Sequence, residues 1–101
     1  MQKIFQGDLI RISGFSAMFL VVSKNAFINH TGMLHVCPVL KNESEGPLHI
    51  IVSGEREKGT VICEQIKLID PAIRGCNRID RISYYQLMNI SDAIQGIFEY
   101  D

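Results

Sequence analysis

The sequence has few of the residues that build covalent or metal-held scaffolds. Its 101 residues include only three cysteines, Cys37, Cys63 and Cys76. They are odd in number and widely spaced, without a Cys-x-x-Cys pair, which argues against both a disulfide framework and a structural zinc site. We therefore expect a reducing compartment and a fold held by its apolar core, for which the 47% of hydrophobic residues provide the material.

Long apolar runs are also lacking. The longest unbroken one, residues 17–22, is far shorter than the roughly 20 residues that a membrane-spanning helix requires. Residues 1–7 carry one lysine and no apolar stretch of signal-peptide length. These features predict a cytoplasmic protein that does not associate with membranes.

Neither sign of charge dominates, since 10 lysines and arginines stand against 11 acidic residues. Sequence-independent nucleic-acid binding requires a large excess of basic residues, so this function is disfavoured. A local excess occurs between residues 67 and 81, where Lys67, Arg74, Arg78 and Arg81 face only two acids, Asp70 and Asp80. The ordinary interpretation of such a run is a solvated face.

What the sequence does contain is a series of short runs rich in β-branched and aromatic residues, separated by turns with glycine. They predict strands at residues 9–12, 17–22, 34–40, 48–52 and 60–69, and a short last strand at 77–82. Pro38 lies inside the third run and indicates an edge strand or a bulge, because proline cannot donate to the ladder. Asp70-Pro71 ends the fifth run.

The hydrophobic period changes at the end of the chain. Residues 83–86, Ser-Tyr-Tyr-Gln, have the spacing of a capping box, and Leu87, Ile90, Ile94 and Ile97 then recur every three or four residues. This pattern predicts an amphipathic helix that covers one face of a sheet. Together the elements predict a single domain over residues 1–101, mainly β, folded as a strongly bent sheet or partly open barrel.

General catalytic motifs are absent, including glycine-rich phosphate loops, His-Glu-x-x-His and Gly-x-Ser-x-Gly. If residues 41–47 close a symmetric hairpin, His35, Cys37 and His49 share one sheet face and could form a soft-metal site. Isolated histidines and buried cysteines on strands usually serve packing, so we favour that role and expect neither a metal nor a cofactor.

Several local signatures nevertheless occur in a characteristic order. They are Phe5-Gln6-Gly7-Asp8-Leu9-Ile10, Leu20-Val21-Val22-Ser23, Phe27, Thr31-Gly32, Val36-Cys37-Pro38-Val39 and Glu64-Gln65-Ile66-Lys67-Leu68-Ile69-Asp70. No single signature is specific, but the Val-Cys-Pro strand followed by the Gln-Ile-Lys strand is distinctive. In this order they resemble the MazF/PemK family of growth-inhibitor toxins.

The resemblance implies a small SH3-like β-barrel of five to six short strands with a C-terminal amphipathic helix, usually paired as a homodimer. It also implies the toxin component of a type II toxin–antitoxin system. Family members typically cut single-stranded messenger RNA without metal, and a cognate antitoxin blocks the groove at the dimer interface. The implied partners are therefore a cognate antitoxin, single-stranded RNA, DNA through the antitoxin complex, and a second copy of the chain.

The sequence departs from the family pattern at two positions that usually carry the chemistry. Ala17-Met18 stands where relatives usually have Arg-Pro, and Val39-Leu40 stands where they usually have Ile-Thr. Loss of one charge-stabilising donor costs about 10²–10³ in rate at comparable sites, so weakened cleavage is expected. No catalytic residue can be assigned by position.

The family pattern is retained at the fifth run and just beyond it. The resemblance makes Gln65, Lys67, Asp70 and Arg74 candidates for contact with RNA or the antitoxin. The alternative is that Gln65 and Asp70 form hydrogen bonds at the strand end while Lys67 and Arg74 are solvated.

Three interpretations of the function stay open. The first is an active endoribonuclease whose missing groups are replaced, with cations from Arg11, Lys24 or Lys41 and hydroxyls from Ser13, Ser16 or Ser23. The second is a catalytically weakened member that acts by binding an antitoxin, RNA or a DNA complex. The third is a structural module that shares only the barrel.

Overall fold

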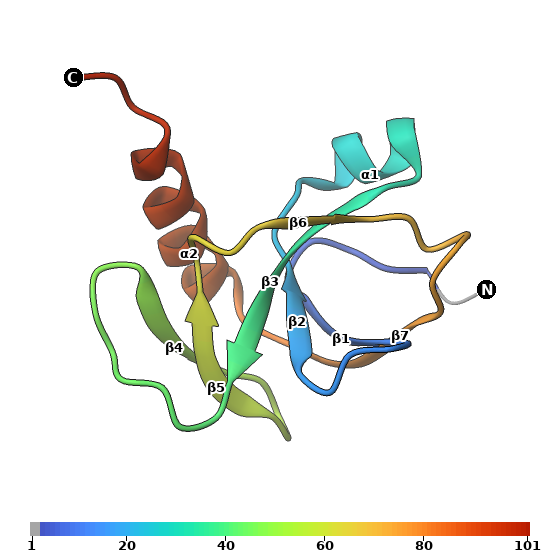
Figure 1. Ribbon diagram of the computed structural model, residues 1–101, viewed down its shortest axis with the longest axis horizontal. Coiled ribbons are helices and arrows are strands. Elements are labelled where there is room, and N and C mark those ends of the chain that lie inside the picture. The colour runs from blue at the N-terminus through green and yellow to red at the C-terminus, as the bar shows by residue number, and fades with distance from the viewer. Residues whose placement is uncertain (1–2) are drawn as a thin grey trace.

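Seven short strands and two helices make up the computed structural model, which describes residues 3–101 (Figure 1). The strands are β1 (Asp8–Ile12), β2 (Met18–Val21), β3 (Leu34–Leu40), β4 (His49–Ser53), β5 (Lys58–Ile62), β6 (Lys67–Ile69) and β7 (Cys76–Arg81). The helices are α1 (Asn25–Thr31) and α2 (Tyr84–Ile97). Within the described residues, neither helix is long and apolar enough to cross a membrane.

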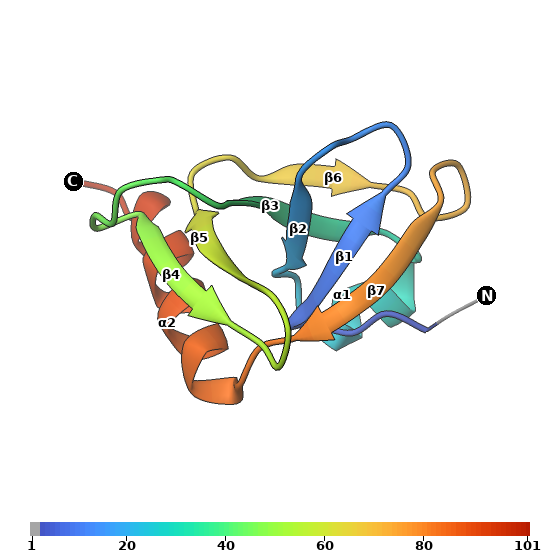
Figure 2. The same ribbon diagram turned by 90° about the horizontal axis from the view of Figure 1, so that it is seen from below.

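All strands pair antiparallel in one strongly bent sheet, in the order β4-β5-β3-β2-β1-β7, with β6 attached to β3. The sheet does not close, so β4 and β7 form its two ends (Figure 2). The predicted class, mainly β with a C-terminal helix, is confirmed. The strands number seven rather than five or six, and the barrel is open.

The run at residues 60–69 was predicted as one strand and is two. β5 pairs with the end of β3 through Val39 and Val61, whereas β6 pairs with its beginning through Val36 and Lys67. A turn at residues 63–66 separates them. It contains neither glycine nor proline, so the sequence carried no signal for the break.

The edge position predicted from Pro38 is also wrong, because β3 lies inside the sheet. On one side Pro38 faces Phe19 of β2. On the other side β6 pairs with residues 34–36 and β5 with residues 39–40, so Pro38 falls between the two partners. The missing N–H is therefore tolerated at the point where β3 changes partner.

Helix α1 was not predicted, since the sequence indicated only a turn at Thr31-Gly32. None of its residues is fully buried, which explains why it has no apolar stripe. Gly32 ends it with a φ of 72°, in the left-handed region that favours glycine, and its N–H bonds the Ile28 carbonyl at 2.8 Å.

Side chains alternate along the strands and create two cores, one on each face of the bent sheet. Leu9, Leu20 and Cys37 belong to the first, and their neighbours Ile10, Phe19 and Val36 to the second. Helix α2 closes the first core with Ile90, which is fully buried. Leu87 and Ile94 pack against this core but are only partly buried. The predicted apolar stripe therefore faces the core, with Ile90 as its one fully buried residue.

The start of α2 is fixed by its cap and by β4. The Ser83 hydroxyl accepts a bond from the Gln86 N–H at 3.4 Å, as the capping-box spacing predicts. The Gln86 side chain does not complete the box. It bonds both backbone groups of Ser53, at 2.7 and 2.9 Å, and so ties the helix to the end of β4.

One carboxylate organises the turn between β4 and β5. Asp80 of β7 accepts bonds of 2.8–3.1 Å from four backbone N–H groups, those of Glu55, Arg56, Glu57 and Arg81. Partial burial opposes its ionisation, but the N–H groups outweigh that effect and hold the pKa of Asp80 at about 2, below its ordinary 3.8. Gly54 allows this approach, because a Cβ there would lie 2.4 Å from the Asp80 Oδ2.

Candidate functional site

The short turn at residues 13–17, hereafter the β1–β2 turn, lies within side-chain reach of β6. Backbone hydrogen bonds shape it, because the Phe15 N–H bonds the Ile12 carbonyl at 3.1 Å and the Ser13 N–H bonds the Gly75 carbonyl at 2.9 Å. Gly14 has a φ of 93°, which the tight reversal requires. The turn contains no acidic residue.

Two of the predicted binding residues meet on one side of this turn. The Lys67 ammonium lies 5.9 Å from the centroid of the Phe15 ring, and the Arg74 guanidinium lies 5.0 Å from it. The ring is held from the other side by Phe19, in an edge-on contact at 5.3 Å. Arg74 also donates from Nη1 to the Ser13 carbonyl at 3.2 Å. Both cations are thus positioned by one aromatic ring.

The other two predicted residues are not part of this cluster. Asp70 accepts a bond from the Ala72 N–H at 3.0 Å, and its carbonyl accepts bonds from the N–H groups of Ile73 and Arg74. Asp70 therefore builds the loop that carries Arg74. Gln65 lies exposed in the turn between β5 and β6, where its N–H bonds the Ile62 carbonyl at 3.1 Å.

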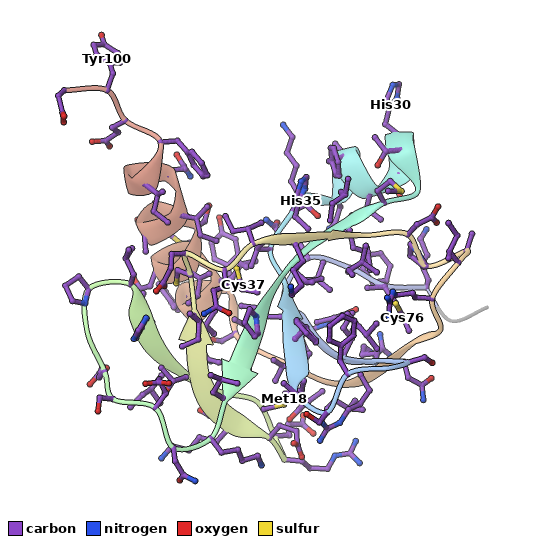
Figure 3. All side chains as sticks on the ribbon, viewed as in Figure 1. Met18, His30, His35, Cys37, Cys76 and Tyr100 are labelled. Atoms are coloured by element: carbon purple, nitrogen blue, oxygen red, sulfur yellow. The ribbon has the colours of Figure 1, made fainter. Side chains whose placement is uncertain are left out.

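On the other side of the β1–β2 turn lies a depression of about 290 Å³. It is lined by Arg11, Ser16, Ala17, Met18, Val39, Leu40 and Lys41. The two departures from the family pattern, at Ala17-Met18 and Val39-Leu40, thus share one hollow. Figure 3 labels Met18, which lines this depression near the end of β3.

Cations also border this depression. Arg11 donates from Nη1 to the Ser16 carbonyl at 2.9 Å, which places its head group next to Ala17. The Lys41 ammonium is exposed and lies 3.8 Å from the Glu57 carboxylate. Of the replacement groups considered from the sequence, Arg11, Ser16 and Lys41 therefore come together. Lys24 instead lies at the N-cap position of α1, without a side-chain capping bond.

Two further candidate hydroxyls do not line this depression. The Ser23 hydroxyl accepts a bond from the His35 N–H at 3.0 Å. Ser13 bonds the Arg74 guanidinium through its backbone carbonyl. Phe15 was not among the predicted site residues, because its role depends on Lys67 and Arg74, which lie far from it in the chain.

The three residues considered for a soft metal do not gather. His35 stacks on Phe27 with 4.9 Å between ring centroids, and Cys37 points into the core (Figure 3). His49 bonds Glu64 at 2.9 Å. Within residues 3–101, no three His, Cys, Asp or Glu side chains converge to hold a metal ion.

The ionisation of Cys37 fits a packing role. Burial raises the pKa of its thiol to about 12, with smaller contributions from Cys63 and Glu64, so the thiol stays neutral. At the surface, the hydrogen bond to the Glu64 carboxylate raises the pKa of His49, and the same bond lowers the pKa of Glu64.

Several solved structures share this fold. A MazE-MazF crystal structure from Deinococcus radiodurans (Form-II) superposes with a TM-score of 0.85 at 16% identity, covering 100% of both chains. An endoribonuclease from Mycobacterial species gives 0.80 at 18% identity, covering 95% of this chain and 91% of that one. The mycobacterial endoribonuclease in complex with its cognate antitoxin gives 0.81 at 16% identity, covering 98% and 100%. At such identities the likeness establishes the fold.

The sequence itself carries the family assignment. No protein among the curated ones matches it significantly. The family described as PemK-like, MazF-like toxin of type II toxin-antitoxin system, however, matches residues 13–98. This stretch runs from the β1–β2 turn to the end of α2 and so includes Lys67, Arg74 and Lys41, whereas Arg11 lies just before it. Because the match covers most of the chain, the protein belongs to the PemK-like, MazF-like toxin family of type II toxin–antitoxin systems.

Proposed function

We propose that this toxin binds single-stranded RNA beside the β1–β2 turn through Lys67 and Arg74, and that it cleaves RNA slowly. The observation that carries the proposal is the placement of both cations on the Phe15 ring, next to a turn without acids. Two side chains held in this way lose little conformational freedom when a phosphate binds.

The hydrogen-bonding capacity of the cluster supports phosphate as its ligand. A guanidinium has five N–H donors, and the bond from Arg74 to Ser13 uses one of them. The Lys67 ammonium contributes three more donors and a compact charge. The chain as a whole has a net charge of −1, so attraction of RNA must depend on such local clusters rather than on the overall field.

Slow cleavage follows from the two residues of the depression that stand where the family pattern has its arginine and threonine. Attack of a ribose 2′-hydroxyl on the adjacent phosphate requires a proton acceptor, a proton donor and positive charge on the phosphorane. Ala17 and Leu40 provide none of these. Loss of one stabilising donor corresponds to roughly 10²–10³ in rate, so we expect binding to be retained better than catalysis.

We further propose a cognate antitoxin as the regulatory partner and a homodimer as the working form. The structural neighbours include MazE-MazF crystal structures and an endoribonuclease in complex with its cognate antitoxin. An acidic antitoxin segment would compete with RNA for Lys67 and Arg74, since carboxylates and phosphates use the same donors. In the cell, DNA would be reached through the antitoxin. Light scattering should give twice the mass of one chain.

The binding test compares two double variants that each remove two positive charges. Lys67→Ala/Arg74→Ala should weaken binding of a long single-stranded RNA and lower its salt slope by about 1.4, since each phosphate contact contributes about 0.7 on a single strand. The matched control is Arg56→Ala/Lys58→Ala, at exposed side chains of the β4–β5 turn and of the start of β5. Equal effects of both double variants would show that only net charge matters, and the proposed contacts would then be wrong.

The cleavage test uses the same RNA in EDTA with the purified parent protein. We expect weak cutting or none, alongside measurable binding. Efficient cutting at defined sites would contradict the claim of slow catalysis. Neither binding nor cutting would instead favour a structural module.

A further inference from the structure

We infer that Arg11 and Lys41 form a second phosphate-binding subsite, across the β1–β2 turn from Lys67 and Arg74. The inference rests on the proposed function, because it assigns a second contact to the same RNA strand. The observation behind it is the lining of the depression at Ala17 and Leu40, which includes Arg11 and Lys41 but no acidic residue.

Arg11 is exposed and is held at the turn by one hydrogen bond. It lies on β1 opposite Met18 of β2, and its guanidinium reaches along the turn to the Ser16 carbonyl. This single bond leaves further N–H groups available to a ligand in the depression. The positive charge lies beside Ala17, the position where the family pattern has an arginine. Arg11 can thus hold a phosphate from β1, but it does not occupy the position of the missing side chain.

Lys41 approaches the same hollow from the end of β3. Its side chain is 65% exposed, and its ammonium lies 3.8 Å from the Glu57 carboxylate, too far for a strong hydrogen bond. A phosphate could therefore replace Glu57 as the partner of the ammonium with little loss of interaction free energy. Glu57 itself is held by the bond from its N–H to Asp80, so its carboxylate stays near Lys41 and competes with the ligand.

The two clusters share the β1–β2 turn as their common support. Arg74 donates to the Ser13 carbonyl at one end of the turn, and Arg11 donates to the Ser16 carbonyl at the other. A nucleic-acid strand that crosses the turn would place successive phosphates against cations on both sides. The floor of the depression, formed by Ala17, Met18, Val39 and Leu40, is apolar and suits a sugar or base face.

The test measures binding of a single-stranded RNA of about twelve nucleotides at several salt concentrations. Arg11→Ala and Lys41→Ala should each weaken binding severalfold and lower the salt slope by about 0.7. Glu57→Gln should have the opposite effect and tighten binding, because it removes the competing carboxylate. Lys58→Ala, at an exposed position of β5, is the control and should behave like the parent.

Arg11→Lys separates charge from structure. If the subsite acts through charge, this variant keeps the salt slope of the parent, while its thermal unfolding and that of Arg11→Ala stay near the parental value. A loss of slope in Arg11→Lys as large as in Arg11→Ala would overturn the subsite, and so would unchanged binding in Arg11→Ala and Lys41→Ala.

The outcomes also separate this inference from the proposed function. If Lys67→Ala/Arg74→Ala weakens binding but Arg11→Ala and Lys41→Ala do not, the proposed function stands and the second subsite is wrong. If only Arg11→Ala and Lys41→Ala weaken binding, RNA uses the depression alone and the Lys67–Arg74 contacts are wrong.

Discussion

The β4–β5 turn and the β1–β2 turn use charge in opposite ways. In the first, the Asp80 carboxylate accepts four backbone N–H bonds and points inward, toward Gly54. In the second, Arg11 and Arg74 each donate one bond to a turn carbonyl, and the rest of each guanidinium remains on the surface.

The difference separates a charge that stabilises the fold from charges that can bind a ligand. A carboxylate whose acceptor sites are all used within the chain has nothing left for a partner, and its loss leaves several N–H groups unsatisfied. A guanidinium with spare donors contributes little to folding but retains capacity for a phosphate. The predictions below test this contrast.

The largest effect on stability should come from Asp80→Asn. The substitution removes the charge from four hydrogen bonds and turns an NH₂ group toward N–H donors. Hydrogen bonds to charged groups contribute about 1.5–3 kcal/mol each, but the four N–H groups can partly rearrange. We therefore expect the free energy of unfolding to fall by about 2–3 kcal/mol. Urea denaturation measures this loss. RNA binding should remain parental, and a parallel loss of binding would break the contrast.

Acid should reveal the same group in the parent protein. The pKa of Asp80 is about 2 in the fold and 3.8 ordinarily, so its contribution is fully present above about pH 5 and is lost as the pH falls toward 2. After allowance for solvent screening we expect about 1–2 kcal/mol from this group. Denaturation between pH 5 and 2 should therefore be less steeply pH-dependent in Asp80→Asn; identical profiles would contradict the assignment.

Removal of a binding cation should change stability much less. For Arg74→Ala we expect less than about 0.5 kcal/mol, because exposed polar contacts of this kind contribute little. Affinity for RNA should nevertheless fall. Thermal unfolding and RNA titration on the same sample decide the point, and a stability loss near that of Asp80→Asn would show that Arg74 is mainly structural.

The smallest effect concerns His49 and Glu64, an exposed pair. It neither organises a turn, as Asp80 does, nor belongs to the proposed RNA contacts. Glu64 raises the pKa of His49, so the pair's small contribution is complete below the ordinary value of 6.5 and fades as the pH rises through the raised value. At the acid end it fades through the lowered pKa of Glu64, below 4.5. Titration by NMR should give a His49 pKa above 6.5 that returns toward 6.5 in Glu64→Gln. A value unchanged by that variant would remove Glu64 as the cause.

Local sequence patterns predicted the elements that depend on neighbouring residues. The period of Leu87, Ile90 and Ile94 identified α2, and Ser83 marked its beginning, because both signals lie within a few residues of one another. The ordered signatures identified the family, and the match over residues 13–98 agrees. The divided run at residues 60–69 and the inner position of Pro38 escaped, since each depends on which distant strand lies alongside.

The sequence by itself determined a mainly β chain with a closing helix, its family, and Lys67 and Arg74 as candidate contacts. Only the tertiary structure decided that both cations share the Phe15 ring and that Ala17 and Leu40 line one hollow with Arg11. Arg74 and Ser13 are 61 residues apart in the chain. Such contacts arise from strand pairing and core packing, which join segments that no local period or spacing connects.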